Sequence, residues 1–109
     1  MAYDEKLAER IRRALAGQKG LAEKKMFGGL SFMLLGNMCC GVLKEDLVVR
    51  AGPDRFEETL ADPHARLMDF TGRPIRGMVY VGPGGYQSDD DLAAWLKRGV
   101  NFALSLPPK

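Results

Sequence analysis

Apolar residues recur every three or four positions in three parts of the chain, a spacing typical of amphipathic helices. The first part predicts a helix over residues 5–16, which Asp4 can cap. The second part is short and has Phe56 and Leu60 as its buried edge. The third part follows Ser88, which can cap a long helix near the end of the chain. The pattern therefore predicts three helices, the second much shorter than the other two.

Between these helices the apolar spacing changes to the alternation of β-strands, bounded by turn signals. The predicted strands cover residues 30–35, 38–43, 47–50, 67–70 and 75–81. Gly36 and Asn37 tolerate positive φ, so we expect them to form a tight hairpin turn between the first two strands. The first three strands are expected to form an antiparallel meander, because only short turns join them.

The element order α-β-β-β-α-β-β-α predicts an α+β fold of two layers, in which helices cover one face of an antiparallel sheet. The other face is not cleanly polar, since Met33 and Leu35 project there together with Met38 or Cys39. Two explanations of this face stay open. Either a second cover such as a partner chain buries it, or a local cluster beneath the loops does.

The 109 residues are enough for one domain, which we expect to span residues 1–109. The hydrophobic fraction of 46% and the charged fraction of 28% are ordinary for a globular protein. No stretch approaches the ~18 apolar residues of a membrane span, and the N-terminus lacks the features of a signal peptide. The adjacent residues Cys39 and Cys40 cannot staple the chain. These features predict a cytoplasmic protein with reduced thiols and no membrane association.

Residue types for catalysis or metal binding are scarce. His64 is the single histidine, and no nucleophile motif accompanies it. On a strand the side chains of Cys39 and Cys40 would point to opposite faces, so they are poorly placed to share a metal ion. The glycine-rich segment 82–85 lacks the lysine and the hydroxyl residue of a phosphate-binding loop. We therefore expect no catalytic, cofactor-binding or metal-binding residues, and a protein that is not an enzyme.

The net charge of +2 permits an anionic partner but does not require one. The candidate nucleic-acid contacts, on the first helix and at the entry to the first strand, are Lys6, Arg10, Arg13, Lys24 and Lys25. Ordinary solvated charge is the other explanation of these residues. Weak nucleic-acid binding through this basic surface is therefore the alternative to a function in protein binding.

Several runs of residues resemble one protein family. They are residues 23–33 (Glu-Lys-Lys-Met-Phe-Gly-Gly-Leu-Ser-Phe-Met), 36–42, 68–74, 77–81 and 105–109. Through these runs the chain resembles the N-terminal domain of the TfoX/Sxy competence regulators over nearly its whole length. The resemblance implies a two-layer α/β fold with an antiparallel sheet, like that of secretion chaperones. It also implies a bacterial regulator, because full-length members promote natural competence genes together with the cyclic-AMP receptor protein.

Those regulators carry a second, C-terminal domain, whereas this chain ends at Lys109, so the resemblance is to a stand-alone first domain. No catalytic residue carries over, because none is established for the family. We expect a non-enzymatic regulatory or interaction module that acts through contacts with a protein partner or with a second copy in a homodimer. The candidate interaction residues are Lys24, Lys25, Met26, Phe27, Gly28, Gly29, Met33, Met38, Arg73 and Arg76.

Overall fold

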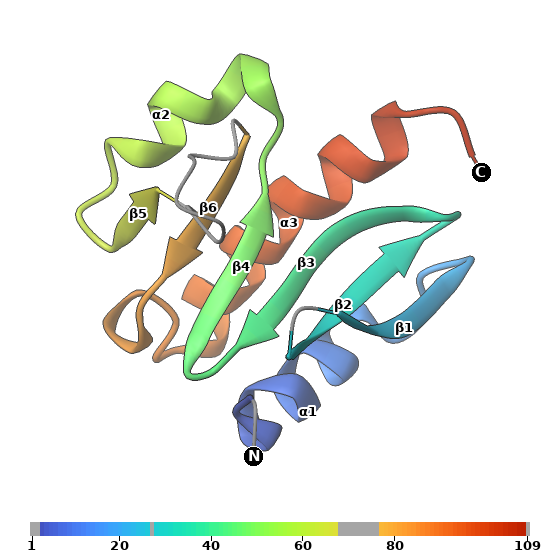
Figure 1. Ribbon diagram of the computed structural model, residues 1–109, viewed down its shortest axis with the longest axis horizontal. Helices are drawn as coiled ribbons and strands as arrows, with labels where there is room; N and C mark the ends of the chain where they lie inside the picture. The colour runs from blue at the N-terminus through green and yellow to red at the C-terminus, as the bar shows by residue number, and fades with distance from the viewer. Residues whose placement is uncertain (1–2, 27, 68–76, 109) are drawn as a thin grey trace.

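A computed structural model of the chain describes residues 3–26, 28–67 and 77–108 (Figure 1). The described strands form one antiparallel sheet in the order β1-β2-β3-β4-β6-β5. They are β1 (Leu21–Met26), β2 (Gly29–Leu34), β3 (Asn37–Leu43), β4 (Asp46–Arg50), β5 (Ala65–Leu67) and β6 (Met78–Val81). The α-helices are α1 (Glu5–Leu15), α2 (Phe56–Leu60) and α3 (Asp89–Ser105), and two short 3-10 helices are η1 (Pro53–Arg55) and η2 (Pro83–Gly85).

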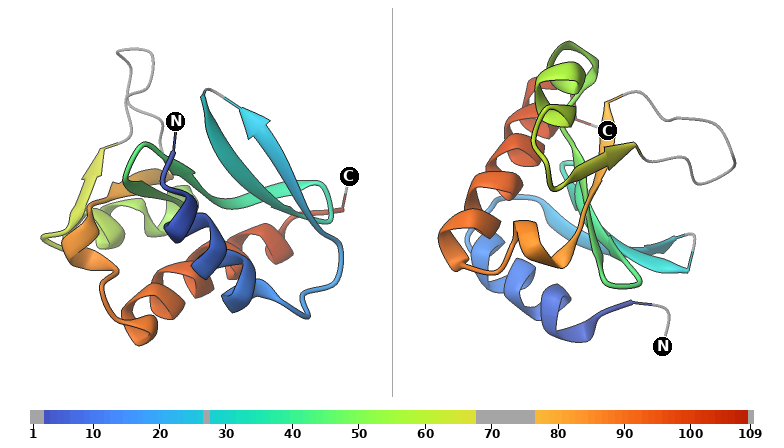
Figure 2. Two further views of the ribbon diagram at one scale, coloured as in Figure 1. Left: turned by 90° about the horizontal axis from the view of Figure 1, so that it is seen from below. Right: turned by 90° about the vertical axis from the view of Figure 1, so that its left-hand side faces the viewer.

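The helices lie on one side of the sheet, and no helix of the described residues covers the other side (Figure 2). α3 crosses β3 and β4, α1 packs against α3 and β3, and α2 contacts β5 and β6. The core between the two layers contains Ile11 of α1, Phe32 of β2, Val49 of β4 and Leu96 of α3, all of them buried. The predicted α+β fold, with an antiparallel sheet and helices on one face, is confirmed.

The two long helices begin at the predicted caps. The Asp4 carboxylate accepts hydrogen bonds from the backbone N–H groups of Lys6, at 2.9 Å, and Leu7, at 3.2 Å. The Ser88 hydroxyl accepts one from the N–H of Asp91 at 3.0 Å. Each cap satisfies N–H groups that have no partner inside the helix, so the caps fix where α1 and α3 begin. Even α3, with 17 residues, is not long and apolar enough to cross a membrane, nor is any other helix of the described ranges.

The first part of the sheet has one strand more than the sequence pattern predicts. β1 escapes prediction because Ala22 to Lys25 are all exposed and show no apolar alternation. The strand is held by its antiparallel register with β2, in which Leu21 lies opposite Leu34. An edge strand forms backbone hydrogen bonds with a neighbour along one side only, and edge strands often carry charged side chains. The sequence of β1 can therefore be polar on both faces.

Other predicted boundaries also shift. The hairpin turn between β2 and β3 consists of residues 35 and 36, because Leu35 has a φ of 51° and Gly36 a φ of 86°. Asn37 belongs to β3 instead, where it is buried and donates its side-chain amide to the Pro107 carbonyl at 3.0 Å. β5 begins at residue 65 and β6 at residue 78. Gly77, which the sequence pattern assigns to the last strand, lies in a turn, and residues 68–70 and 75–76 of the two predicted strands lie outside the described residues.

Candidate interaction surfaces

The side of the sheet without helices is formed by side chains that alternate away from the core. Leu30, Phe32 and Leu34 of β2 are buried in the core, so the intervening Ser31 and Met33 lie on the opposite side. The strand register assigns their neighbours to the same side. We call this set the helix-free face: Ser31, Met33, Met38, Val48, Arg50, Met78 and Tyr80.

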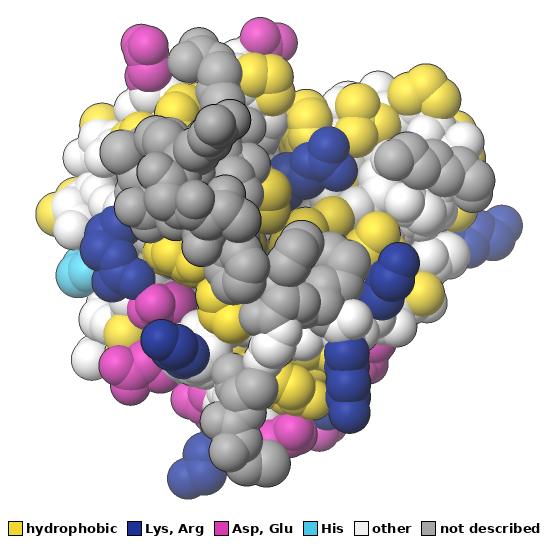
Figure 3. Space-filling view, viewed as in Figure 1, with side chains coloured by type: hydrophobic (Ala, Val, Ile, Leu, Met, Phe, Trp, Pro, Cys, Tyr) yellow, Lys and Arg dark blue, Asp and Glu magenta, His cyan; other side chains and the backbone are white. Residues whose placement is uncertain are grey.

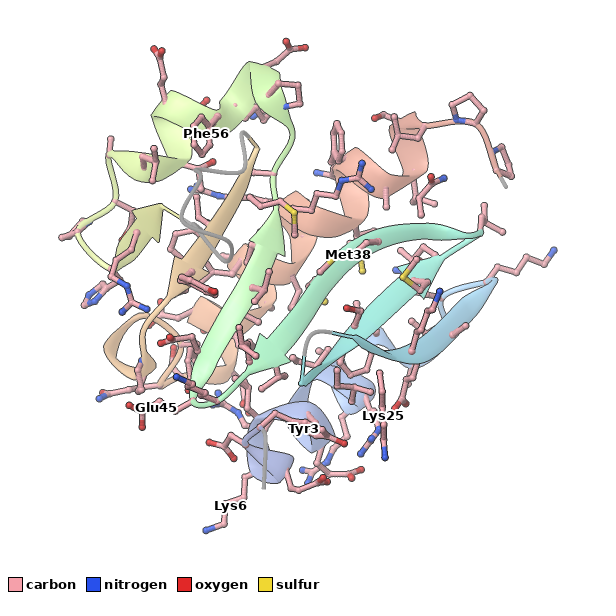
Figure 4. All side chains as sticks on the ribbon, in the orientation of Figure 1. Tyr3, Lys6, Lys25, Met38, Glu45 and Phe56 are labelled. Carbon is pink, nitrogen blue, oxygen red and sulfur yellow. The ribbon has the colours of Figure 1, made fainter. Side chains whose placement is uncertain are left out.

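Methionines and an arginine make up much of the partly exposed area of the helix-free face. Met33 lies directly opposite Met38, and Met78 lies opposite Arg50. All four are partly exposed, and the Arg50 guanidinium lies 5.1 Å from the centre of the Phe102 ring. Figure 3 looks onto this side of the molecule and shows hydrophobic side chains on it, and Figure 4 labels Met38 above β3. Methionine side chains are flexible and polarizable, so such a face can adapt to another protein surface.

β1 and the turn that follows it contain another group of candidate interaction residues. Lys24 and Lys25 are exposed, and as neighbours on a strand they lie on opposite faces of the sheet. Gly28 has a φ of 78°, and a Cβ on Gly29 would lie 2.3 Å from the carbonyl oxygen of Val42. Both glycines are therefore explained by backbone geometry, as expected for a turn and a close approach of two strands.

The remaining candidate interaction residues are placed only in part. Met26 is the last residue of β1 and lies opposite Gly29. Phe27, Arg73 and Arg76 lie outside the described residues. Of the described candidates, Met33 and Met38 lie on the helix-free face, whereas Lys24, Lys25, Met26, Gly28 and Gly29 lie in β1, in the turn after it and at the start of β2.

One candidate nucleic-acid contact, Arg10, is occupied within the fold. Its guanidinium donates hydrogen bonds to the Gln87 carbonyl at 3.2 Å and to the Asp89 carboxylate at 3.3 Å. The same group lies 5.7 Å from the centre of the Tyr86 ring. Arg10 therefore joins α1 to the beginning of α3, and Asp89 neutralises part of its charge.

The other four candidate nucleic-acid contacts are spread over different parts of the surface. Lys6 and Arg13 are exposed on α1, and Figure 4 shows that Lys6 points away from Lys25. Lys25 lies on the same side of β1 as α1, because its neighbour in the register is the core residue Leu30. Lys24 lies on the opposite side, next to Ser31 of the helix-free face. The structure does not bring the five residues together on one surface.

Residues 13–103 match the family model of the TfoX N-terminal domain. The chain belongs to this family. The match includes every described strand of the sheet and most of α3, so the resemblance that the sequence runs indicate is confirmed. No curated protein and no solved structure gave a significant match to the chain.

A β-bulge in this TfoX N-terminal domain turns both cysteines toward the core. Phe32 lies opposite Cys40, but the next residue of β2, Met33, lies opposite Met38, so Cys39 is an extra residue of β3. Cys39 and Cys40 are both 0% exposed, and their sulfur atoms lie 3.7 Å apart. The prediction that they occupy opposite faces is wrong, because the bulge interrupts the strict alternation of the strand.

The burial of the two thiols bears on their reactivity. The hydrogen bond with Cys39, together with burial, raises the pKa of the Cys40 thiol well above its usual range, and the same hydrogen bond lowers the pKa of the Cys39 thiol. A thiol that stays protonated and has no access to solvent is a poor nucleophile and a poor metal ligand. Both thiols are 0% exposed, so burial separates each of them from reagents and metal ions, and the pair packs as two small apolar side chains of the core.

Two cavities beside α3 join polar residues that lie far apart in the sequence. One has a volume of about 270 Å³ and is lined by Asp62, His64, Gly84, Gly85, Asp91, Ala94, Trp95 and Arg98. The other, about 350 Å³, is lined by Ala51, Gly52, Pro53, Asp54, Arg55, Arg98, Asn101, Phe102 and Ser105. Sequence reasoning missed both, because only the packing of α3 beside η1 and η2 creates them.

The smaller cavity contains His64, the single histidine of the sequence. It places His64 near the carboxylates of Asp62 and Asp91, but Cys39 and Cys40 do not line it. Within the described ranges, no group of three or more His, Cys, Asp or Glu side chains is placed to hold a metal ion. The residues that line the cavity include no Ser, Thr or Cys side chain that His64 could activate as a nucleophile.

Proposed function

We propose that this TfoX N-terminal domain is a non-enzymatic regulatory module that binds a protein partner through its helix-free face. The observation that supports this best is the partial exposure of Met33, Met38 and Met78 on a sheet face where the described residues place no helix. An apolar patch of this kind on a soluble domain is typical of an interaction site. We further propose a cytoplasmic location, in keeping with the two free cysteines of the core.

The chemistry of the face favours a reversible contact. Full burial of one methionine side chain contributes about 1.5–3 kcal/mol. Met33, Met38 and Met78 are already partly buried, so each can add only a fraction of that amount. Arg50 supplies a charge at the same place, which can orient a partner that carries an acidic group. A regulator needs binding of this kind, which is specific but can be undone.

The cavity at His64 supports the proposal that the domain binds and does not catalyse. Catalysis by a histidine needs a nucleophile or a substrate proton within hydrogen-bond reach, and a group that orients the imidazole. Both thiols are buried, and neither of them lines the cavity. These features favour a structural role for the residues around it.

The test is affinity capture from the native cell with three forms of the protein: wild type, Met38→Lys and Leu104→Lys. Leu104 is the matched control, because it is a large hydrophobic residue of α3 that is 51% exposed. We expect Met38→Lys to lose a partner that both wild type and Leu104→Lys retain, since a lysine on the helix-free face would have to be desolvated. Thermal unfolding of each variant verifies that it is folded.

The same proteins distinguish the two kinds of protein contact. If the partner is a second copy of the chain, the mass of the wild type in solution doubles at high concentration and that of Met38→Lys does not. If all three forms capture the same proteins and all are monomers, the helix-free face is not an interaction surface and the proposal fails.

A further inference from the structure

Among the described residues, β1 is the longer of the two strands at the edges of the sheet. It pairs with β2 along one side, and no described strand pairs with its other side. β1 has six residues, whereas β5, at the opposite edge, has three. The outer backbone N–H and C=O groups of such an edge can accept a further strand. Ala22 to Lys25 are exposed, so their side chains do not block the approach of one.

The side chains of β1 give this edge a positive charge. The carboxylate of Glu23 is already bound by Arg12, whose guanidinium donates to both of its oxygens at 2.8 and 2.9 Å. Lys24 and Lys25 form no ion pair with any described residue. Figure 3 shows dark blue side chains over this part of the sheet. The edge therefore presents two uncompensated lysines, one on each face.

A strand added to β1 would lie beside both lysines at once. Adjacent residues of the added strand also point to opposite faces, so two consecutive acidic residues would meet Lys24 and Lys25 respectively. Opposite charges directly across a strand pair are favourable, whereas like charges are not. The backbone of the added strand would supply hydrogen bonds that do not depend on its sequence, and the acidic pair would supply selectivity.

A second copy of the chain fits this edge less well. In an antiparallel pair of β1 strands centred on Lys24, that lysine faces its own symmetry mate, which is unfavourable. The carboxylate of Glu23 would face Lys25 of the other copy, but it is already bound to Arg12. An acidic strand from a different protein has neither disadvantage.

We propose that β1 binds an extended, acidic segment of a partner protein as an additional strand of the sheet. This inference rests on the proposed function, because it assumes that the domain works by binding another protein. It adds a second contact, at the sheet edge, to the one on the helix-free face, and it specifies the chemistry of the segment: β-favouring residues around two consecutive acidic ones.

The probe is a fluorescent peptide, Thr-Val-Asp-Glu-Val-Thr, titrated into the full chain at low salt. A copy with N-methyl groups on alternate peptide nitrogens keeps the charge but cannot form the backbone ladder. Lys24→Glu with Lys25→Glu reverses the charge of the edge. Lys6→Glu with Lys97→Glu is the control, because both residues are exposed helix lysines and the change in net charge is the same.

We expect the wild type and the control to bind the peptide with similar affinity, and the β1 variant to bind at least about fivefold more weakly, since two exposed ion pairs are lost. We also expect the methylated peptide to bind more weakly, and the amide protons of β1 to exchange more slowly when the peptide is bound. Equal binding of both peptides without protection of β1 would show non-specific attraction and would overturn the proposal, as would no binding at all.

Two further outcomes separate the alternatives. If short duplex DNA displaces the peptide and protects the same amides more strongly, the edge is a nucleic-acid surface and the proposal is wrong. If the peptide does not bind but Met38→Lys still loses a captured partner, the proposed function stands and only the inference about β1 fails. If the peptide does not bind and Met38→Lys loses no captured partner, both the proposed function and the inference about β1 fail.

Discussion

Gly99 of α3 packs directly against the backbone of β3. A Cβ at this position would lie 2.1 Å from the carbonyl oxygen of Cys39, whereas real Cβ atoms essentially never approach another atom within 3.0 Å. The oxygen belongs to β3, which is fixed between β2 and β4, so it cannot move aside easily. In Gly99→Ala the helix itself must therefore shift away from the sheet by close to ~1 Å.

Two opposing effects decide the stability of Gly99→Ala. Alanine is a better helix former than glycine by about 1 kcal/mol, which favours the variant. Overpacking of a tight core costs about 1–3 kcal/mol, and the upper part of this range applies here because the obstacle is backbone. We expect the free energy of unfolding of Gly99→Ala to be lower than that of the wild type by about 1–2 kcal/mol. Each kcal/mol lowers the Tm of a domain of this size by about 4–8 °C.

Urea denaturation and thermal unfolding measure this difference. Asn101→Ala is the matched control, since Asn101 is exposed on the same helix and should gain up to about 0.7 kcal/mol from helix propensity alone. If Gly99→Ala is as stable as the wild type, or more stable, α3 does not approach β3 this closely and the reasoning is refuted.

Two other predictions concern the charged pair on α1 and β1 and the buried thiols. The hydrogen bond from Arg12 lowers the pKa of Glu23. A carboxylate whose pKa is lowered by folding contributes its full stabilisation above its unfolded pKa of ~4.3. This stabilisation is lost as the pH falls through the folded pKa. We expect Glu23→Gln to lower the free energy of unfolding by about 1 kcal/mol at pH ~7 and by almost nothing at pH ~2, as measured by urea denaturation. An equal decrease at both pH values would show that the ion pair with Arg12 is not the source of the stabilisation. Cys39 and Cys40 should react with a thiol reagent only after the protein is unfolded, and a fast reaction of the native protein would show that the core at the bulge is open.

The elements that the sequence predicts well are those with a strong local signal. Asp4 and Ser88 are hydrogen-bonding caps that act within three residues, so they mark the beginnings of α1 and α3 correctly. The alternation of Leu30, Phe32 and Leu34 places β2 against the core. The runs of residues that resemble the TfoX N-terminal domain also identify the family correctly, since its family model matches residues 13–103.

The features that the sequence does not reveal depend on strand pairing and tertiary contacts and not on local periodicity. β1 has no apolar alternation, and its strand conformation follows from pairing with β2. The bulge that turns Cys39 inward depends on how β3 pairs with β2, which the two adjacent cysteines do not reveal. Arg10 looks like one of several solvated cations, but it contacts Gln87 and Asp89, 77 and 79 positions further along the chain.

The sequence by itself indicated the family, through the runs of residues that resemble it. It also determined the fold class, the starts of α1 and α3 and the sheet from β2 to β4, because short-range periodicity and capping encode them. Only the tertiary structure decided which cations remain unpaired, that both thiols are buried, and that β1 forms an open, lysine-bearing edge. These are properties of how the segments of the chain pair and pack. They depend on register and packing, which no local pattern of residues specifies.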